Sequence, residues 1–566
     1  MSSKGKTKQQ IKKVVPHKKV IAAKPQQSKR WLIALFGVIV LTFIIYIPAL
    51  KNFLTGWDDK DYIIINKLIH NFNFETVKNI FSLKSGFIMG NYHPITILSY
   101  AIEYHYAKIN PSLYHVTNVI IHLLNILMVF LFIKLLTRNN YLVAFITSLL
   151  FAIHPMHVES VAWVAEQKDL LYTFFELASL CAYILYIKKN EKKWIYYFLC
   201  LILFIASILS KGMAVAMAAL LPLIDYYLGR KFTDKKIWIE KIPFFVIAIF
   251  FGLIATKAQQ ASSALVFTNY SFYDRVLFAG YGIITYLWKC ILPVELSCFY
   301  GYPGKGTYGW YIIYVVASLG IAWLVYRSSK RTKEIMFGVL FFLFSVALVL
   351  QVIPVGAAVI AERYTYVAYI GLFFLIGQGI SYVLKNRKKL SIFVNSIIVI
   401  FVIALTIGTF NRCKVWKDTL SIWNDALGKD PDCIKGLNGR GDAYNEKRQY
   451  DLAIKDLDKA LQLKVDYTDA YYNRGISYYY LGKSSLESGQ KEQAVKYIEQ
   501  SINDNTSALK YSPNLSLAYF NRSGDYFTLG NYNAALADVL RSKELGMDVD
   551  PEYIKALEAG IKTDKK

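Results

Sequence analysis

The sequence predicts an all-α protein in which a polytopic membrane helix bundle of about 11 spans is followed by a C-terminal α-solenoid. Three observations predict this fold class. The chain of 566 residues is 55% hydrophobic and 16% aromatic, which is too apolar for an ordinary soluble protein. Many of its apolar runs approach or exceed the roughly 18 residues that a membrane helix needs. From residue 411 onward the sequence becomes polar, helical in pattern and repetitive.

The distribution of charge excludes a nucleic-acid-binding domain. The net charge is +25, but residues 411–566 hold 23 basic and 23 acidic residues. The excess lies in residues 1–30, which hold ten Lys or Arg and no acid, and in the membrane part. Such clusters mark the cytoplasmic ends of membrane helices. We therefore expect membrane lipid but no nucleic acid as a partner.

Three regions follow from these patterns. Residues 1–30 are predicted to be a disordered basic tail at the cytoplasmic surface, and residues 31–410 to be the membrane domain. Residues 51–112 form a first loop outside the membrane, and residues 411–566 form the extracytoplasmic repeat region. The predicted spans are residues 31–50, 113–136, 141–153, 169–187, 194–209, 213–228, 242–256, 309–326, 335–354, 364–384 and 390–410.

One further apolar segment, residues 276–292, is predicted to be interfacial or re-entrant. If it crossed the membrane, the basic cluster after residue 326 would lie on the outer side, against the preference of Lys and Arg for the cytoplasm. The sequence thus places the N-terminus inside and the repeat region outside. We expect a bacterial inner membrane with periplasmic repeats, or the endoplasmic reticulum in a eukaryote.

The repeat region has a period of 34 residues, the distance from Gly441 to Gly475. The stretch 438–444 recurs at 472–478 and at 520–526. A 34-residue period with small residues and Tyr at fixed positions resembles tetratricopeptide repeats. The second repeat carries an insertion around residues 484–491. The alternative is an unrelated helical bundle.

Two adjacent carboxylates, Asp58 and Asp59, follow directly on the first apolar run. A carboxylate on the outer face can act as a general base toward an acceptor hydroxyl. Partial burial and neighbouring negative charge would raise its pKa. The alternative is a solvated turn or a helix N-cap, where Asp is also common.

A second group of ionisable residues occupies residues 154–169, at the outer end of the third predicted span. Two histidines and a glutamate at this spacing fit a metal site, whereas the imidazoles with a lysine fit a phosphate. A plain polar turn is the third alternative. The group consists of His154, His157, Glu159, Glu166, Lys168 and Asp169.

Three shorter motifs fall on the same predicted side: Tyr92-His93-Pro94, Ser210-Lys211-Gly212 and Glu362-Arg363-Tyr364. Each motif is weak alone, because basic residues at helix ends often only reach toward the interface. Under the 11-span topology, however, all five groups face one side of the membrane, as the parts of one site should.

The Asp pair, the His-Pro-Met-His-Val-Glu-Ser-Val-Ala stretch, the Ser-Lys-Gly and Glu-Arg-Tyr motifs and the C-terminal repeats resemble the transmembrane and tetratricopeptide repeat-containing (TMTC) family. That family comprises protein O-mannosyltransferase-like members of the GT-C glycosyltransferase superfamily. The resemblance covers about residues 31–540. It implies a GT-C-like membrane domain, a polyprenyl-phosphate-linked sugar as donor and inversion at the anomeric carbon.

The resemblance also implies roles for individual residues. Asp58 matches the family's general base, and Asp59 its acidic neighbour, which orients the base or the acceptor. His93, Lys168, Lys211 and Arg363 would meet the donor phosphate. His154, His157, Glu159, Glu166, Asp169, Glu362 and Tyr364 would line the substrate site. Related enzymes often work without metal, so no cofactor is expected and a divalent ion is not favoured.

The repeats would present a protein or peptide acceptor, with mannose and Ser or Thr hydroxyls as the expected partners in transfer. The main alternative is a non-catalytic membrane scaffold that uses its repeats for assembly. A transporter is disfavoured, because the ionisable groups gather at one boundary and residues 31–410 show no internal duplication. A disulfide between Cys413 and Cys433 is considered for an extracytoplasmic region.

Overall fold

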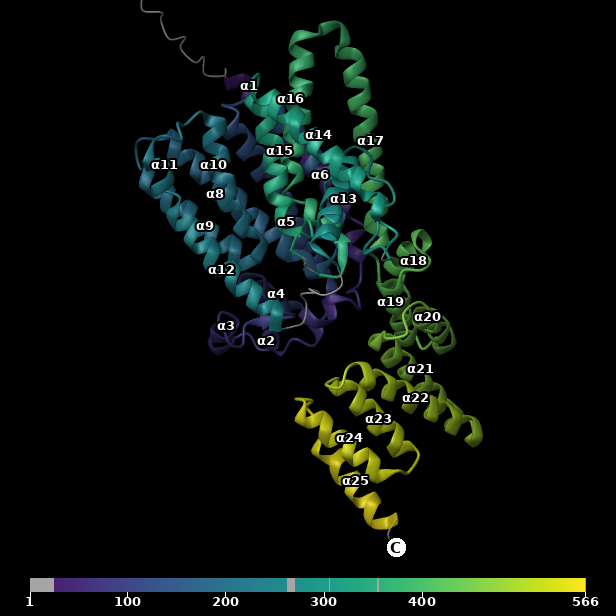
Figure 1. The fold of residues 1–566 in the computed structure, drawn as a ribbon. Coiled ribbons are helices and arrows are strands. Elements are labelled where there is room, and N and C mark those ends of the chain that lie inside the picture. The colour runs from purple at the N-terminus through teal and green to yellow at the C-terminus, as the bar shows by residue number, and fades with distance from the viewer. Residues whose placement is uncertain (1–24, 262–269, 305, 354–355, 565–566) are drawn as a thin grey trace, which may run out of the picture.

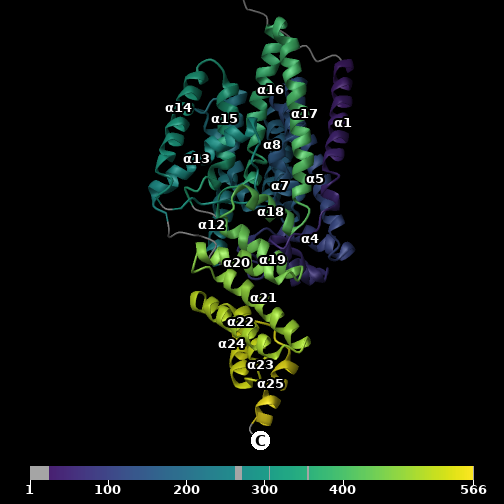
Figure 2. The same cartoon turned by 90° about the vertical axis from the view of Figure 1, so that its right-hand side faces the viewer.

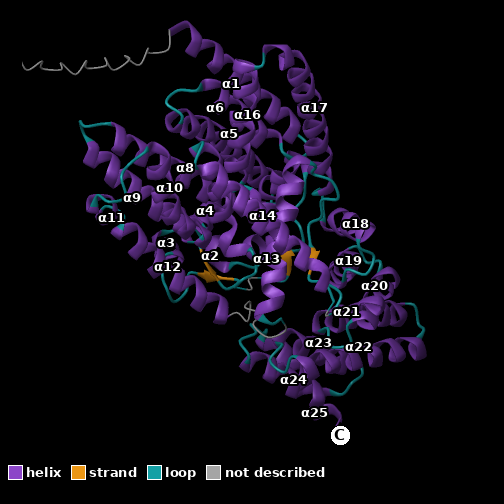
Figure 3. Cartoon of the chain, turned by 45° about the horizontal axis from the view of Figure 1, so that its top comes forward, coloured by secondary structure: helices purple, strands orange, loops and turns teal. Residues whose placement is uncertain are grey.

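The computed structural model describes residues 25–261, 270–304, 306–353 and 356–564, and these form a helical bundle joined to a helical solenoid (Figure 1). Most of the predicted basic tail, residues 1–24, lies outside the described residues. The described strands form two short antiparallel pairs, β1 with β2 and β3 with β4 (Figure 3). Their bounds are Phe87–Ile88, Asn91–Tyr92, Tyr300–Gly301 and Ala358–Ile360. The all-α prediction is therefore confirmed.

Eleven helices correspond to the eleven predicted spans. They are α1 Pro25–Tyr46, α5 Pro111–Leu136, α6 Tyr141–Ile153, α8 Gln167–Lys188, α9 Lys193–Ser210, α10 Met217–Leu228, α12 Ile242–Ala261, α14 Ile312–Ser329, α15 Lys333–Val346, α16 Tyr369–Asn386 and α17 Ser391–Val415. Among the described residues, seven helices are long and apolar enough to cross a membrane, and eight if a pair bent by 60° after Ile153 counts as one span. Because α10, α15 and α16 fall short of that test, the count of 11 stays a prediction.

Shorter helices fill the connections. They are α2 Lys67–His70, α3 Phe74–Ile80, α4 Pro94–Ala107, α7 Val158–Ala162 and α11 Lys235–Ile239. Helices α2, α3 and α4 lie within the predicted first loop, residues 51–112. Asparagine caps explain where two helices start: the Asn73 side chain accepts from the Thr76 amide, and Asn110 accepts from Ser112.

Segment 276–292 forms one uninterrupted helix, α13 (Phe272–Ile291), which is not among the candidate spans. Near its start, Arg275 Nη1 donates to the Val352 carbonyl at 3.0 Å. Toward its end, the Tyr286 hydroxyl accepts from the Ala361 amide at 3.1 Å. Both contacts lie on the segment between α15 and α16, so α13 runs along one end of the bundle. The placement of this segment as interfacial or re-entrant stays a prediction.

The bundle has two distinct ends. The tail end is where α1 begins and where the α14–α15 and α16–α17 connections turn (Figure 2). The α5–α6, α8–α9 and α10–α12 connections belong to the same end. The site end carries the first loop, the 154–166 segment and the repeats. All the predicted cytoplasmic Lys and Arg clusters lie in connections of the tail end. The repeats and the first helix therefore start from opposite ends of the bundle (Figures 1 and 2).

Eight helices follow α17: α18 Thr419–Lys429, α19 Ile434–Glu446, α20 Tyr450–Leu463, α21 Thr468–Glu487, α22 Lys491–Tyr511, α23 Ser516–Thr528, α24 Tyr532–Glu544 and α25 Pro551–Asp564. Three pairs, α19–α20, α21–α22 and α23–α24, are the predicted repeats. The predicted insertion does not form a loop. Instead, α21 and α22 are lengthened to 20 and 21 residues, compared with 13 and 14 residues in α19 and α20.

An arginine of the repeated motif joins the two helices of a repeat through hydrogen bonds to an aspartate. Arg440 makes two hydrogen bonds to Asp456, at 2.6 and 2.8 Å, and Arg522 makes the same pair to Asp538 at 2.7 and 2.9 Å. The small residues of the motif let the paired helices cross closely. A Cβ added to Gly441 would lie 2.7 Å from Leu457 Cγ. These contacts explain the Arg and Gly that recur in the sequence.

All six cysteines are free and buried. Cys413 sits in the last turn of α17 and Cys433 caps α19, where its sulfur accepts from the Gly436 amide at 3.4 Å. The disulfide considered between them is therefore not formed.

Candidate active site

The Asp59 carboxylate connects the first loop to the segment before α8 through hydrogen bonds. Its Oδ2 accepts from the Thr55 amide at 2.8 Å and from the Thr55 hydroxyl at 2.9 Å. Its Oδ1 accepts from the Ala165 amide at 2.7 Å. The side chain is fully buried, and burial raises its pKa to about 7, although the hydrogen bonds act the other way. Asp59 is therefore built into the loop rather than available to a substrate.

Its neighbour Asp58 lacks such hydrogen-bond partners among the described residues. The side chain is half-buried, and no donor within the described residues forms a hydrogen bond to it. Burial raises the pKa of Asp58, while the nearby charge of Lys168 lowers it. A π-helical turn, Lys60–Ile64, follows at once and separates the two carboxylates from the rest of the loop. An unpaired carboxylate with a raised pKa has the properties of a general base.

A compact ionic cluster lies beside this loop, with Glu166 at its centre. Glu166 Oε1 lies 3.2 Å from Lys168 Nζ and 3.3 Å from Arg363 Nε, and Oε2 lies 3.3 Å from Lys211 Nζ. Lys211 also pairs with Asp169 at 2.5 Å. The Arg363 backbone amide donates to Glu159 at 2.9 Å, and its guanidinium pairs with the same carboxylate.

These residues come from four separated segments: α7, the turn Val164–Glu166 with the first turn of α8, the α9–α10 connection and the 3-10 helix Glu362–Thr365. The structure thus brings together six of the residues predicted for the site. Three cations face three buried carboxylates, so the cluster is balanced in charge. Each cation still holds N–H groups that these pairs do not use.

Aromatic rings orient the cations. Lys168 Nζ lies 4.9 Å from the centre of the Tyr62 ring, and the Arg363 guanidinium lies 5.0 Å from Tyr364 and 5.6 Å from Trp163. His93 packs against Tyr62 with 5.4 Å between ring centres. Burial, followed by Lys168 and Lys211, lowers the pKa of His93 to about 3, so the ring is neutral. Its Nε2 is buried without a partner in the described part of the chain.

His154 and His157 lie apart from this cluster. His154 Nε2 contacts the Cys290 carbonyl at 3.1 Å, and His157 Nδ1 contacts the Phe151 carbonyl at 2.8 Å. Their rings pack against Tyr369 and Phe373 of α16. Through these contacts the two histidines hold the 154–162 segment in place. The described residues contain no group of three or more His, Cys, Asp or Glu that could hold a metal ion.

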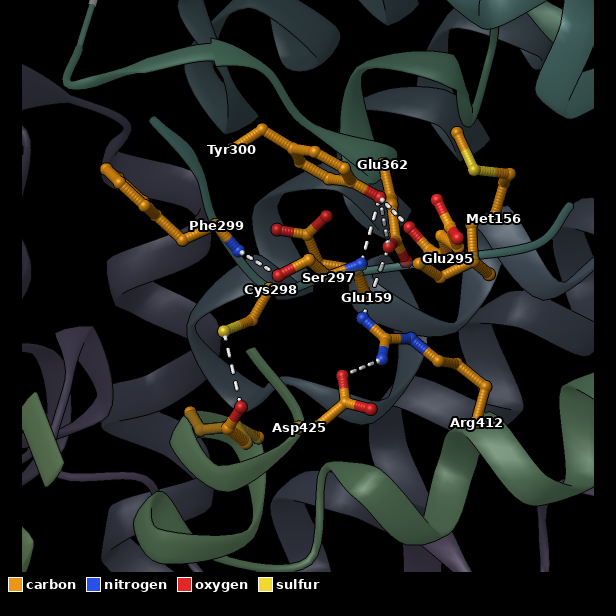
Figure 4. Close-up of polar contacts among 12 residues, drawn as sticks. Met156, Glu159, Glu295, Ser297, Cys298, Phe299, Tyr300, Glu362, Arg412 and Asp425 are labelled. Carbon is orange, nitrogen blue, oxygen red and sulfur yellow. Dashed lines mark hydrogen bonds and ion pairs between the residues drawn. The ribbon is translucent and has the colours of Figure 1, made fainter. Parts of the chain in front are cut away.

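A second buried ion pair connects the Glu-Arg-Tyr motif to the repeats (Figure 4). Glu362 Oε1 accepts from the Tyr300 hydroxyl at 3.0 Å and from Arg412 Nη2 at 3.2 Å. The other arm of Arg412 reaches Asp425 of α18 at 2.7 Å. Burial raises the pKa of Glu362 to about 7, and the Arg412 charge opposes that rise. Sequence reasoning missed Tyr300, Arg412 and Asp425, because nothing local links them.

Four tryptophans join the first loop, the segment before α8 and the start of the repeats. Trp57 stacks on Trp163 with 4.8 Å between ring centres, and Trp163 stacks on Trp416 at 5.4 Å. Trp57 also contacts Trp423 of α18 at 5.0 Å. Trp57 directly precedes Asp58, so helix α18, which leads into the repeats, packs on the loop that carries the unpaired carboxylate.

Comparisons with known proteins agree with this architecture. A family model described as TPR repeat matches residues 441–482. The chain is 25% identical over 464 residues to a protein O-mannosyl-transferase of Caenorhabditis elegans, covering 76% of this chain and 62% of that protein. It is 24% identical over 437 residues to the protein O-mannosyl-transferase TMTC3 of Homo sapiens, covering 70% of this chain and 47% of that one.

The chain thus spans about half to three fifths of the length of these curated relatives. Among solved structures, an oligosaccharyltransferase of Archaeoglobus fulgidus matches with a TM-score of 0.39 and 12% identity, over 76% of this chain and 60% of that chain. That score is too low to support an argument. The sequence matches agree with what the motifs and repeats indicate: the chain is similar to the transmembrane and tetratricopeptide repeat-containing (TMTC) proteins.

Proposed function

We propose that the protein is an integral-membrane glycosyltransferase that moves a sugar from a polyprenyl-phosphate donor to a hydroxyl acceptor. The observation that carries the proposal is the free Asp58 carboxylate beside a cluster of three cations, at the mouth of a membrane helix bundle. The names of the two relatives support transfer of mannose to protein. Ser and Thr hydroxyls of a polypeptide are therefore the proposed acceptors.

In the proposed reaction the loop supplies the general base, and the cluster stabilises the leaving group. Asp58 takes the proton from the acceptor hydroxyl while that oxygen attacks the anomeric carbon. The bond between this carbon and the phosphate oxygen breaks, and the polyprenyl phosphate leaves with the electron pair. Attack opposite the leaving group inverts the anomeric centre.

The cations stabilise the leaving phosphate. Lys168, Lys211 and Arg363 are fixed by Glu159, Glu166 and Asp169, so they need little reorganisation as charge develops on the phosphate. The neutral His93, with its unpartnered nitrogen, supplies a further hydrogen bond. In this proposal fixed side chains do the work that a divalent ion does in other transferases.

Asp59 acts as a positioning residue. Its three hydrogen bonds hold the loop so that Asp58 faces the cluster. The repeats stand at the same end of the bundle, and we propose that they bring the polypeptide acceptor to Asp58. The outer side of a membrane, periplasmic in a bacterium, is the proposed location of this end.

A second candidate function is a membrane scaffold that retains an inactive site. The charge balance of the cluster favours this alternative, because each cation already has a carboxylate partner. A scaffold would need the repeats and the docking of α18, but not the free carboxylate of Asp58.

A transfer assay separates the two functions. The full chain is incubated with a panel of polyprenyl-phosphate sugars and Ser- or Thr-containing peptides, with and without EDTA. We expect one donor to be consumed, a glycopeptide to form, and the rate in EDTA to stay within about twofold. Binding of peptides without consumption of any donor would favour the scaffold. Loss of transfer in EDTA, restored by a divalent ion, would contradict the metal-free mechanism.

A further inference from the structure

A basic cavity opens at the tail end of the bundle, far from the candidate active site. Its volume is about 480 Å³. It lies between the α5–α6 connection, the end of α10 and the α14–α15 connection. The lining residues are Leu136, Thr137, Arg138, Tyr227, Leu228, Ser329, Lys330, Arg331, Thr332, Lys333 and Glu334. Four of them are cations and one is an acid, so the cavity selects for an anion.

The two arginines of the cavity come from different connections and are unpaired. Among the described residues, the guanidiniums of Arg138 and Arg331 have no hydrogen-bond or ion-pair partner, and both side chains are exposed. The lysines are partly engaged: Lys333 Nζ donates to the Tyr226 carbonyl at 3.1 Å, and Lys330 lies 5.9 Å from the Tyr326 ring centre. The carboxylate of Glu334 accepts from the Thr332 hydroxyl.

The backbone holds Arg138 in place at some cost. Arg138 and Asn139 have φ angles of 53° and 70°, in the left-handed region that residues other than glycine seldom adopt. This turn follows the last residue of α5 and precedes the Asn140 cap of α6. Two non-glycine residues in that region indicate that the surrounding structure requires this turn. The turn places Arg138 at the cavity. Arg331 lines the same cavity from the α14–α15 connection.

The flank of the cavity is apolar and open. Helix α14, which leads into the cavity, exposes Leu319, Trp323 and Leu324 by 66, 58 and 59%. Arg327 lies over the Trp323 ring at 5.3 Å, and aromatic residues of this kind mark the boundary between lipid tails and headgroups. A phospholipid presents an anion at this level with apolar chains beside it. A guanidinium pair also suits a phosphate geometrically.

We propose that this cavity binds the phosphate headgroup of an anionic glycerophospholipid, with Arg138 and Arg331 as its two principal ligands and the acyl chains along α14. The site would anchor the α5–α6 and α14–α15 connections to the membrane surface. It does not depend on the proposed glycosyl transfer.

The experiment titrates the purified full chain in detergent with phosphatidylglycerol and counts bound lipids by native mass spectrometry. Phosphatidylcholine is the zwitterionic comparison, and inorganic phosphate is the soluble competitor. The test variant is Arg138→Gln with Arg331→Gln. The control is Lys231→Gln with Arg387→Gln, which removes two exposed charges at the same end but outside the cavity.

We expect the wild type and the control to bind one phosphatidylglycerol more tightly than phosphatidylcholine, and the test variant to bind it about tenfold more weakly or worse. Equal binding by all three proteins would overturn the site. Displacement of the lipid by millimolar inorganic phosphate would show a soluble-anion site and overturn the lipid assignment. If the double variant does not fold, Arg331→Gln alone gives the same test, because this exposed side chain forms no hydrogen bond or ion pair with the described residues.

Discussion

Two neighbouring aspartates with the same local sequence context have opposite roles in this structure. Asp59 accepts three hydrogen bonds and is fully buried, whereas Asp58 is half-buried and free. The difference arises from Thr55 and Ala165, which donate hydrogen bonds to the Asp59 carboxylate and none to that of Asp58. Removal of Asp59 should therefore disturb the loop, and removal of Asp58 should disturb only the chemistry.

The burial of Asp59 predicts a specific pH dependence of stability. Its pKa rises from an ordinary value of 3.8 to about 7 in the folded chain. The folded state then binds a proton that the unfolded state has released, so this group's contribution to stability falls as pH rises from about 4 to about 7. Thermal unfolding in detergent at pH 4.5 and pH 8 measures it. We expect Tm to fall more with pH in the wild type than in Asp59→Asn. An identical fall in both proteins would show that Asp59 does not titrate in this way.

The sequence identifies Asp58 and Asp59 as a candidate pair, but it does not show that the two carboxylates differ in their surroundings. An acidic pair after an apolar run indicates a site at a membrane boundary, and the ionic motifs that follow it do converge. The hydrogen bond from Ala165 spans more than 100 positions in the chain, and no periodicity encodes it. The same holds for Arg412, which in sequence is one of several basic residues after an apolar run.

At the level of elements, helix α18, which precedes the three repeat pairs, packs on the loop of the candidate site. The Gly56 amide donates to the Thr419 hydroxyl at 2.7 Å, and the Phe53 amide donates to the Lys417 carbonyl at 2.8 Å. A Cβ added to Gly56 would lie 3.3 Å from Thr419 Oγ1 and 3.5 Å from Glu446 of α19. The loop that carries Asp58 is therefore held from outside by α18 and α19.

This docking predicts that a core residue of α18 affects transfer. Trp423→Ala removes a side chain that is 2% exposed and packs on Trp57, and such truncations cost roughly 3–5 kcal/mol. We expect the rate of transfer to fall at least tenfold at a temperature where the variant is still folded, because the loop loses its outer support. Tm and initial rates are measured together.

The matched control is Leu557→Ala in α25, which also truncates a fully buried side chain but at the far end of the repeats. It should lower Tm and leave transfer to a short peptide within about twofold. If both variants reduce the rate to the same extent at equal loss of stability, α18 has no special connection to the site.

The sequence predicted the helices well and their departures from regularity poorly. Apolar runs gave α6 as residues 141–153 with both ends correct. The 34-residue period gave the three repeat pairs. The π-helical turn at Lys60–Ile64 has no counterpart in the local sequence pattern. The bend of 60° after Ile153 coincides with Pro155, and the extension of α21 and α22 coincides with the predicted insertion.

At the level of the whole molecule, the membrane bundle and the repeats are joined without a linker. Helix α17 ends at Val415 and α18 begins at Thr419, so only residues 416–418 separate them. Trp416 is fully buried in that connection. Arg412 pairs with the Glu-Arg-Tyr motif on one side and with α18 on the other. The repeats are thus fixed relative to the site, as the presentation of an acceptor would require.

The opposite placement of the two ends can be tested by cysteine labelling. All six native cysteines are buried, so they need not be removed. Ser488→Cys places an exposed thiol between α21 and α22, and Glu191→Cys places one between α8 and α9 at the tail end. In intact bacterial cells expressing the protein, we expect a membrane-impermeant maleimide that enters the periplasm to label position 488 only. Permeabilised cells should label both. Labelling of 191 alone in intact cells would reverse the proposed orientation.

The most direct test of the central claim compares two aspartate variants in the transfer assay. Asp58→Asn removes the proposed base, and Asp61→Asn removes an exposed acid from the same turn of the loop. Both variants should keep the Tm of the wild type within a few degrees, because neither side chain accepts a hydrogen bond from the described chain. The account predicts that Asp58→Asn lowers transfer by about 10²–10⁴-fold and that Asp61→Asn keeps it within a few-fold. Transfer by Asp58→Asn at the rate of the wild type would contradict the account.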